Sequence, residues 1–393
     1  MSNAYIVSAV RTPVAKAFKG GFRNTRPDDL LAHVIREAMA EVPGIPPEKV
    51  EDVIIGCAMP EAEQGMNVAR IGALLAGLPD NVPGVTVNRF CSSGLQTIAM
   101  AADRIRLGEA DVMIAGGTET MTMVPMMGHK IAMNPRVFDD EHVAIAYGMG
   151  ITAEKVSEQY GVSRQDQDQF AYRSHQKAIA AIDSGAFTEI RPVTVTHHLP
   201  DPTSGAIRKI EQVIDTDEGP RRDTTAEALG KLRTVFRADG TVTAATSSQM
   251  SDGAGALVLV SERALKEYGL EPLAVFRGFS VAGVPPEIMG IGPIAAIPKV
   301  LAQTGVSKEQ LDWIELNEAF AAQALAVIRD VGLDPDKVNP LGGAIALGHP
   351  LGATGAILAA KAIHGMRRNQ QKYGLVTMCI GTGMGAAGIF EAL

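Results

Sequence analysis

Short apolar runs alternate with longer, helix-like stretches in the first and last parts of the chain. Residues 5–10 and 84–87 have the length and composition of strands, whereas residues 92–106 and 352–366 read as helices. Strands that alternate with helices along a sequence are typical of βαβ units, in which the strands lie parallel in one sheet. The pattern therefore predicts an α/β fold.

Three segments of the first part recur in the last part, in the same order and at nearly constant spacing. In each match a polar or glycine-rich junction adjoins an apolar run. Strand–helix units look alike in any α/β protein, so each match by itself is weak. Together they predict two similar α/β halves with reactive residues at equivalent strand-to-helix junctions. The matched positions are Asp52 with Asp312, Cys91 with His349, and Gly116 with Gly381.

The region between the halves, about residues 120–246, is rich in Met, Pro and charge. It contains one amphipathic helix, roughly residues 164–184. Long insertions in α/β folds tend to cover active sites or shape ligand pockets. After it, the apolar run 257–260 returns to the first half. The predicted division is an N-terminal domain (1–119), an inserted loop domain (120–249), a return segment (250–270) and a C-terminal domain (271–393).

Composition and charge narrow the function classes. The chain has 393 residues, 46% of them hydrophobic and 20% charged, which fits a well-buried protein of two or three domains. A net charge of −8 without a dense Lys/Arg stripe argues against nucleic-acid binding. No apolar run of membrane-spanning length occurs, and the start resembles neither a signal peptide nor a transit peptide. Three cysteines do not make a disulfide framework, so we expect a reducing cytoplasm.

Cys91 is the first candidate reactive group. It follows the strand-like residues 84–87 and precedes a predicted helix at about residue 92. The N–H groups of a helix start favour a thiolate and can hold an oxyanion. The alternative is a small buried residue at a tight junction, since free Cys is often buried. The Ser-Ser-Gly sequence at 92–94 packs poorly in a core and favours the reactive interpretation.

Three further segments carry candidate chemistry. His349 lies between Gly348 and Pro350, and we expect Pro350 to be the first residue of the next helix. Cys379 ends an apolar run, where it could be a reactive thiol or, equally, a buried strand residue without a chemical role. For Cys57 we expect the structural interpretation. The glycine run at 381–385 lacks the spacing of a phosphate loop. Asn317 ends another apolar run, where its carboxamide could orient a water or a carbonyl oxygen.

Cys-Ser-Ser-Gly at 91–94, Asn-Glu-Ala-Phe at 317–320, Gly-His-Pro at 348–350 and Cys-Ile-Gly at 379–381 resemble motifs of the thiolase family. The resemblance extends over nearly the whole chain. It implies a thiolase-like five-layered α/β fold of two duplicated domains with an inserted loop domain. It also implies reversible carbon–carbon cleavage of 3-ketoacyl-CoA, with coenzyme A and acetyl-CoA as substrates, no metal and no covalently bound cofactor.

The same resemblance implies a role for each residue. Cys91 would accept the acyl group, His349 would activate it, and Cys379 would move the α-proton or protonate the leaving enolate. Asn317, through a water, and His349 would form one oxyanion hole; the N–H groups of Cys91 and Gly381 would form the other. An oxyanion hole is required because a thiolate can act on the α-carbon only if the enolate is stabilised. The residues implied along coenzyme A are Arg221, Leu232, Phe236, Ser248, Met289, Ala319 and Phe320.

Gly148 and Met149 bear on substrate size. Short-chain members of the family usually carry His at the position of Gly148, where the imidazole crowds the acyl pocket. The smaller residue leaves room for a medium or long acyl chain, as in fatty acid β-oxidation. A short-chain acetoacetyl-CoA enzyme of biosynthesis remains the alternative. The resemblance further implies a homodimer or homotetramer and allows a partner in a β-oxidation multienzyme complex.

Other function classes fit less well. A Cys-His-Asn hydrolase could use Cys91, His349 and Asn317, but it would leave Cys379 without a role. A decarboxylating ketoacyl synthase would be expected to place two histidines in the site, and His349 alone has a suitable setting. A non-catalytic acyl- or lipid-binding relative would have lost reactive residues, and all four are present.

Overall fold

A large mixed sheet of ten strands runs through the computed structural model, which describes residues 3–393. The strands are β1 (Tyr5–Arg11), β2 (Ala15–Lys16), β3 (Asp52–Gly56), β4 (Gly84–Val87), β5 (Val112–Thr120), β8 (Ser251–Val260), β9 (Ala274–Gly283), β10 (Leu311–Leu316), β11 (Tyr373–Ile380) and β12 (Met384–Ala392). They lie in the order β10-β11-β12-β9-β1-β8-β5-β3-β4, with β2 paired to β8. After the inserted segment the chain returns to the strands of its first half, because β8 lies between β1 and β5.

The sheet repeats one arrangement of four strands. In the first half β3, β5, β8 and β1 lie side by side, and β10, β11, β12 and β9 repeat their order and directions in the second half. The halves join where β1 pairs antiparallel with β9. β4, which pairs with β3, has its counterpart in a bridge between Ile314 and Val338. The predicted duplication is confirmed by this topology.

The expectation of parallel sheets holds only for β3 with its neighbours β4 and β5, and for β10 with β11. The other pairs are antiparallel. β12 follows β11 after a short turn at residues 381–383. A parallel neighbour would need a long crossover, so this connection forces the antiparallel direction.

Helices form three layers around the strands of the two halves. α3 and α11 contact each other and strands of both halves, and α1 and α2 cover the first half. α8 covers the second half, and residues of α9 share its core. Alternate strand residues supply different cores: Leu257 and Leu259 face the central core, whereas Val258 and Val260 face the outer one. With the strands of each half counted as one layer, the three helical layers and the two strand layers make five. The helices are α1 (Pro27–Ala40), α2 (Val68–Leu75), α3 (Ser93–Arg106), α7 (Glu262–Glu267), α8 (Gly292–Thr304), α9 (Ala321–Val331), α10 (Ala344–Leu347) and α11 (Thr354–Arg368).

The two central helices meet at their first turns. A Cβ at Gly355 of α11 would lie 2.1 Å from the backbone nitrogen of Leu95, and one at Gly94 of α3 would lie 2.7 Å from that of Ala356. Only glycine allows this approach. The crossing brings the starts of both helices, and the turns before them, to one place.

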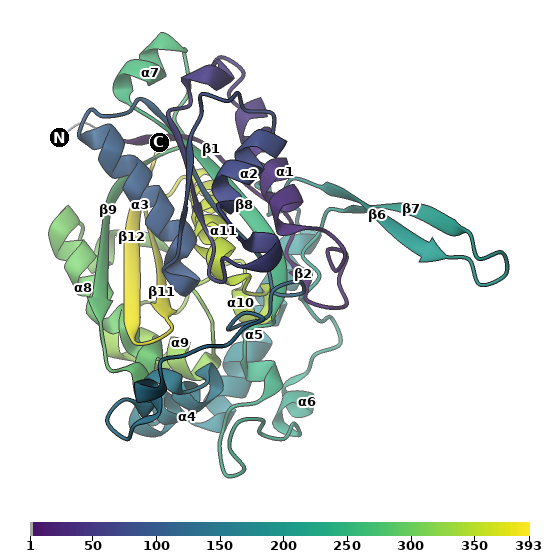
Figure 1. Cartoon of the computed structure of the whole chain (residues 1–393). Helices are drawn as coiled ribbons and strands as arrows, with labels where there is room; N and C mark the ends of the chain where they lie inside the picture. Colours follow the sequence, from purple (N-terminus) through teal and green to yellow (C-terminus); the bar gives the residue numbers. More distant parts are fainter. Residues whose placement is uncertain (1–2) are drawn as a thin grey trace.

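The segment between β5 and β8 builds separate structure. It forms α4 (Met149–Gln159), α5 (Arg164–Asp183), α6 (Ala226–Gly230) and the ribbon of β6 (Val193–Pro200) and β7 (Ile207–Ile214). α5 confirms the amphipathic helix predicted at 164–184; its N-cap, Ser163, accepts a hydrogen bond from the backbone of Asp166. Figure 1 shows α4, α5 and α6 at the end of the molecule opposite the chain termini, and the β6–β7 ribbon projecting from the body.

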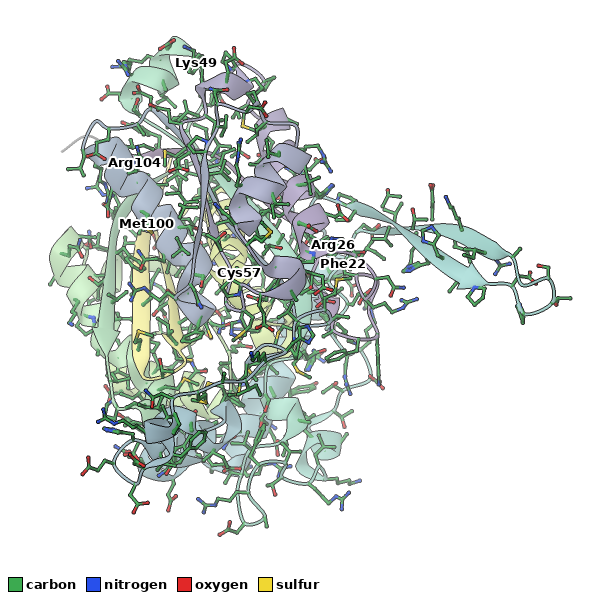
Figure 2. All side chains as sticks on the ribbon, viewed as in Figure 1. Phe22, Arg26, Lys49, Cys57, Met100 and Arg104 are labelled. Carbon is green, nitrogen blue, oxygen red and sulfur yellow. The ribbon has the colours of Figure 1, made fainter. Side chains whose placement is uncertain are left out.

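The segments that follow β3 and its parallel neighbours lie toward the end of the molecule where α4, α5 and α6 are found. In Figure 2, Lys49, just before β3, lies at the end with the chain termini, and Cys57, just after β3, lies toward the other end. The strands parallel to β3 run the same way. Among residues 3–393, no helix has both the length and the apolarity needed to cross a membrane.

Candidate active site

Cys91 and His349 lie at equivalent turns of the two halves. Cys91 belongs to the 3-10 turn η3 (Phe90–Ser92), which leads from β4 into α3. His349 stands just before the turn η9 (Leu351–Ala353), which leads into α11. The turn η3 contacts both η9 and β11, so segments that are distant in sequence meet here. The expectation that Pro350 begins the helix is wrong, because η9 comes first.

The His349 ring is held at both nitrogens. Nδ1 lies 2.6 Å from Oγ1 of Thr354, and Nε2 lies 3.3 Å from Nδ2 of Asn317. The Thr354 hydroxyl donates to the carbonyl of Pro350, so it accepts from Nδ1–H, and Nε2 then accepts from the Asn317 amide. Burial lowers the pKa of His349 to about 4. The ring is therefore neutral at pH 7, with Nε2 free of a proton.

The backbone around His349 needs a glycine. Gly348 has φ +104°, and a Cβ there would lie 2.2 Å from the hydroxyl oxygen of Ser251. That oxygen, at the start of β8, accepts a hydrogen bond from the His349 N–H at 3.2 Å. The histidine is thus fixed to a strand of the first half although it belongs to the second.

Asn317 is fixed through its backbone. Its N–H donates to the carbonyl of Thr377 at 3.0 Å, and its carbonyl accepts from Nε2 of Gln323 at 3.1 Å. Its side-chain oxygen is buried and has no hydrogen-bond partner among the described residues. An unpaired buried oxygen is costly, and such groups mark functional positions.

The two predicted reactive thiols lie close enough to interact electrostatically. Burial raises the pKa of Cys91 to about 11, although the N–H groups of Gly381 and of Cys91 itself bond its sulfur and oppose the shift. Burial also raises the pKa of Cys379, and the charge of Cys91 adds to that. The prediction that the helix start favours the thiolate is wrong for the resting site, because loss of solvent outweighs these two donors. Cys91 therefore needs a base.

Most of the residues predicted along coenzyme A lie around Cys379. Ser248 donates its backbone N–H to the carbonyl of Ala319 at 2.9 Å, and Phe236 meets Phe320 edge-on with ring centroids 6.0 Å apart. The apolar cluster that contains Cys379 consists of Ala153, Val242, Met289, Ala319 and Phe320, with Met149 packed against it. The structure thus gathers these residues, which come from the inserted region and from the second half.

Arg221 and Leu232 lie outside that cluster, at the surface. The Arg221 backbone donates to Nδ1 of His175 at 3.2 Å, whereas no ion pair of its guanidinium is recorded among residues 3–393. Its neighbour Arg222 pairs with Asp183. The Arg221 charge is thus available to an anionic group at the surface.

Gly148 and Met149 differ in what they face. Gly148 is the exposed N-cap of α4, and a Cβ there would meet no atom within 4 Å. Met149 turns inward, and its sulfur would lie 3.8 Å from a Cβ at Gly381. Gly148 thus faces solvent, and the next residue, Met149, packs against the Cys379 cluster.

Sequence reasoning missed Thr354, Gln323 and Glu119. Thr354 and Gln323 lie in ordinary helical sequence and carry no signal beyond their closeness to His349 and Asn317. Glu119 was detectable, because it is the one charged residue of the buried strand β5. Cys57 is fully buried beside Gln64, in keeping with the structural interpretation. Among residues 3–393, no group of three or more His, Cys, Asp or Glu side chains could hold a metal ion.

Comparisons with known proteins cover the whole chain. The family model for the thiolase N-terminal domain matches residues 4–263, and that for the C-terminal domain matches residues 270–392. A 3-ketoacyl-CoA thiolase of Bacillus subtilis (strain 168) is 53% identical over 393 residues, 100% of both chains.

Two solved structures match with a TM-score of 0.89. Bacillus anthracis acetyl-CoA acetyltransferase is 41% identical, and human mitochondrial 3-ketoacyl-CoA thiolase is 37% identical; each comparison covers 100% of this chain and 99% of the other. The fold, its internal repeat and these matches together show that the chain belongs to the thiolase family.

Proposed function

We propose that the protein is a 3-ketoacyl-CoA thiolase, which transfers an acyl group between the Cys91 sulfur and coenzyme A with reversible carbon–carbon cleavage. The observation that carries this proposal is the pairing of Cys91 with Cys379 beside the Gly381 N–H, in a turn that contacts η9, the turn just after the neutral His349. A hydrolase would need one thiol. Carbon–carbon cleavage needs a nucleophile and a separate group that moves a proton on carbon.

In the first half-reaction the Cys91 thiol gives its proton to Nε2 of His349, and its sulfur attacks the C3 carbonyl of a 3-ketoacyl-CoA. The C2–C3 bond breaks and leaves the acyl group on Cys91 as a thioester. C2 departs as the enolate of acetyl-CoA and takes the proton of Cys379. The raised pKa of Cys379 suits this step, because a protonated thiol is the required acid.

In the second half-reaction the thiol of free coenzyme A gives its proton to the Cys379 thiolate and attacks the thioester. The shortened acyl-CoA leaves, and the Cys91 sulfur recovers its proton from His349. Negative charge on the substrate oxygens would be held by His349 with an Asn317-bound water in one step and by the N–H groups of Cys91 and Gly381 in the other. Each such donor contributes about 10²–10³ in rate.

We infer that residues 120–249 form a loop domain that binds coenzyme A, between an N-terminal domain (1–119, with the return segment 250–270) and a C-terminal domain (271–393). Leu232, Phe236 and Ser248 would lie along the pantetheine with Met289, Ala319 and Phe320, and Arg221 would face a phosphate. The cluster around Cys379 and the exposed Arg221 guanidinium support this placement.

The missing side chain at Gly148, whose neighbour Met149 packs against the Cys379 cluster, supports medium or long acyl chains and a role in fatty acid β-oxidation. The second candidate is a short-chain acetyl-CoA C-acetyltransferase of biosynthesis, which the likeness to the Bacillus anthracis acetyl-CoA acetyltransferase favours. The two differ in the ratio of kcat/KM for a ten-carbon 3-ketoacyl-CoA to that for acetoacetyl-CoA. The first candidate requires a ratio above one.

We further infer a cytoplasmic homodimer or homotetramer, with a possible β-oxidation enzyme as partner. Three free cysteines suit a reducing compartment. Exposed apolar residues of the inserted segment, among them Met126, Met127 and Ile131, suit a surface between copies. Light scattering after gel filtration tests this, and a monomeric mass would reject the oligomer.

The test of the proposed reaction separates the two thiols. Cys91→Ala, incubated with acetyl-CoA and weighed by intact mass spectrometry, should carry no acetyl group. Cys379→Ser should still be acetylated on Cys91 but should lose cleavage of a 3-ketoacyl-CoA, followed by its enolate absorbance. An acetyl adduct on Cys91→Ala, or full cleavage by Cys379→Ser, would reject the assignment.

A further inference from the structure

Glu119, near the end of β5, is a fully buried carboxylate that meets hydrogen-bond donors on both oxygens. Its Oε2 accepts from the N–H groups of Ala58 at 2.7 Å and Gly352 at 2.8 Å. Its Oε1 accepts from Nε2 of Gln64 at 2.6 Å and from the N–H of Met59 at 3.3 Å. Every one of these partners is a donor. The proposed reaction assigns this group no role.

The donors come from both sides of the candidate site. Ala58 follows β3 and packs with Leu351 in an apolar cluster that Cys91 adjoins. Gly352 lies in η9, three residues after His349, and a Cβ there would lie 2.7 Å from Oε2 of Glu119. One side chain therefore joins the residues beside the nucleophile to the turn that follows its base.

We propose that Glu119 is a positioning residue, which ties the loop after β3 to the turn after His349 and so sets the place of His349 relative to Cys91. This inference rests on the proposed function. Gln64 orients the carboxylate, because its own Oε1 accepts the backbone N–H of Thr120 at 2.6 Å and leaves only its amide hydrogens to face Glu119.

Burial raises the pKa of Glu119, and the hydrogen bonds from Ala58, Gln64, Gly352 and Met59 oppose that shift and favour the ionised form. A protonated carboxyl would present an O–H to donors alone and leave it unpaired. The ionisable groups that face the charge are the thiols of Cys57, 3.9 Å from Oε1, and of Cys91, and the charge raises the pKa of both. Glu119 thus helps to hold Cys91 as a thiol until His349 takes its proton.

Glu119→Gln tests the inference, since the amide keeps the shape, removes the charge and turns an NH₂ group toward two donors. Displacing a catalytic group by about 1 Å costs on the order of 100-fold in rate, so kcat for cleavage should fall about 100-fold. KM for the acyl-CoA should change less than about threefold, because no substrate contact is lost. Alkylation of Cys91 by iodoacetamide at pH 8, located by peptide mass spectrometry, should become about threefold faster, because the charge that disfavours the thiolate is gone.

The matched control is Glu189→Gln, which removes a carboxylate that is also buried but pairs with Arg11 away from these turns. Its kcat, divided by the fraction of enzyme whose Cys91 can be acetylated, should stay within about twofold of the wild-type value. The same holds for its rate of alkylation at Cys91. Equal losses in both variants would overturn the inference, as would a Glu119→Gln enzyme with wild-type kcat.

Two further comparisons keep the result decisive. Should Glu119→Gln yield no folded protein, Glu119→Asp keeps the charge but shortens the reach to Gly352; kcat should fall while the alkylation rate stays at the wild-type value. A Glu119→Asp enzyme with wild-type kcat would reject the positioning role.

If the wild-type enzyme itself shows no cleavage, the proposed function fails. If wild type cleaves and the variants match it, only this inference fails.

Discussion

Gly148→His should remove the proposed preference for long acyl chains. The backbone at Gly148, with φ −61° and ψ 146°, accepts any residue, and a Cβ there meets no atom within 4 Å. An imidazole would therefore enter the open space beside Met149 without strain. It should cover two to three methylene groups of a bound acyl chain. At about 0.8 kcal/mol for each buried methylene, the loss is about 2 kcal/mol, or about 30-fold in kcat/KM.

The assay compares kcat/KM for a ten-carbon 3-ketoacyl-CoA and for acetoacetyl-CoA at saturating coenzyme A. The long substrate should lose about 30-fold in Gly148→His, whereas acetoacetyl-CoA should change less than about threefold. Gly148→Ala is the matched control, since a methyl group reaches no neighbour and should leave both values unchanged. Unchanged ten-carbon activity in a folded Gly148→His enzyme would refute the placement of the acyl chain. A strong wild-type preference for acetoacetyl-CoA would refute the long-chain proposal itself.

Three further predictions follow from buried polar contacts. Thr354→Val leaves Nδ1–H of His349 without its acceptor, so it should lower the rate of Cys91 acetylation by about 10-fold or more. Thr354→Ser keeps the hydroxyl and should restore the rate. Stopped-flow mixing with acetyl-CoA measures both variants. Because the pKa of His349 is lowered to about 4, the ring becomes protonated and stops acting as a base only as the pH falls toward 4. The acetylation rate should therefore not decline between pH 8 and pH 6. A fall in that rate with a midpoint near pH 6.5 would contradict the neutral ring. Arg11→Met should destabilise the fold by about 3–5 kcal/mol in urea unfolding, because it strands the buried carboxylates of Asp217 and Glu189; a loss below about 1 kcal/mol would show that they find other partners.

The sequence was enough to predict the local elements and the family. Apolar runs and their turns predicted β4 and α3 to within a residue, and the spacing of matched segments predicted two similar halves. Those features are local or periodic, so they are visible in the order of residues. The motifs around Cys91, Asn317, His349 and Cys379 are likewise short, and the family could be named from them.

Only the tertiary structure decided the directions of the strands and the electrostatics of the site. The pKa of Cys91 depends on how much solvent the fold removes, and burial reversed the expectation drawn from the helix start. The orientation and proton position of the His349 ring depend on Thr354 and Asn317, which the fold brings together from separate elements. Glu119 meets Gly352 from a distant part of the sequence. Contacts of this kind arise from three-dimensional packing between elements, and a one-dimensional pattern carries no record of which side chains will face each other.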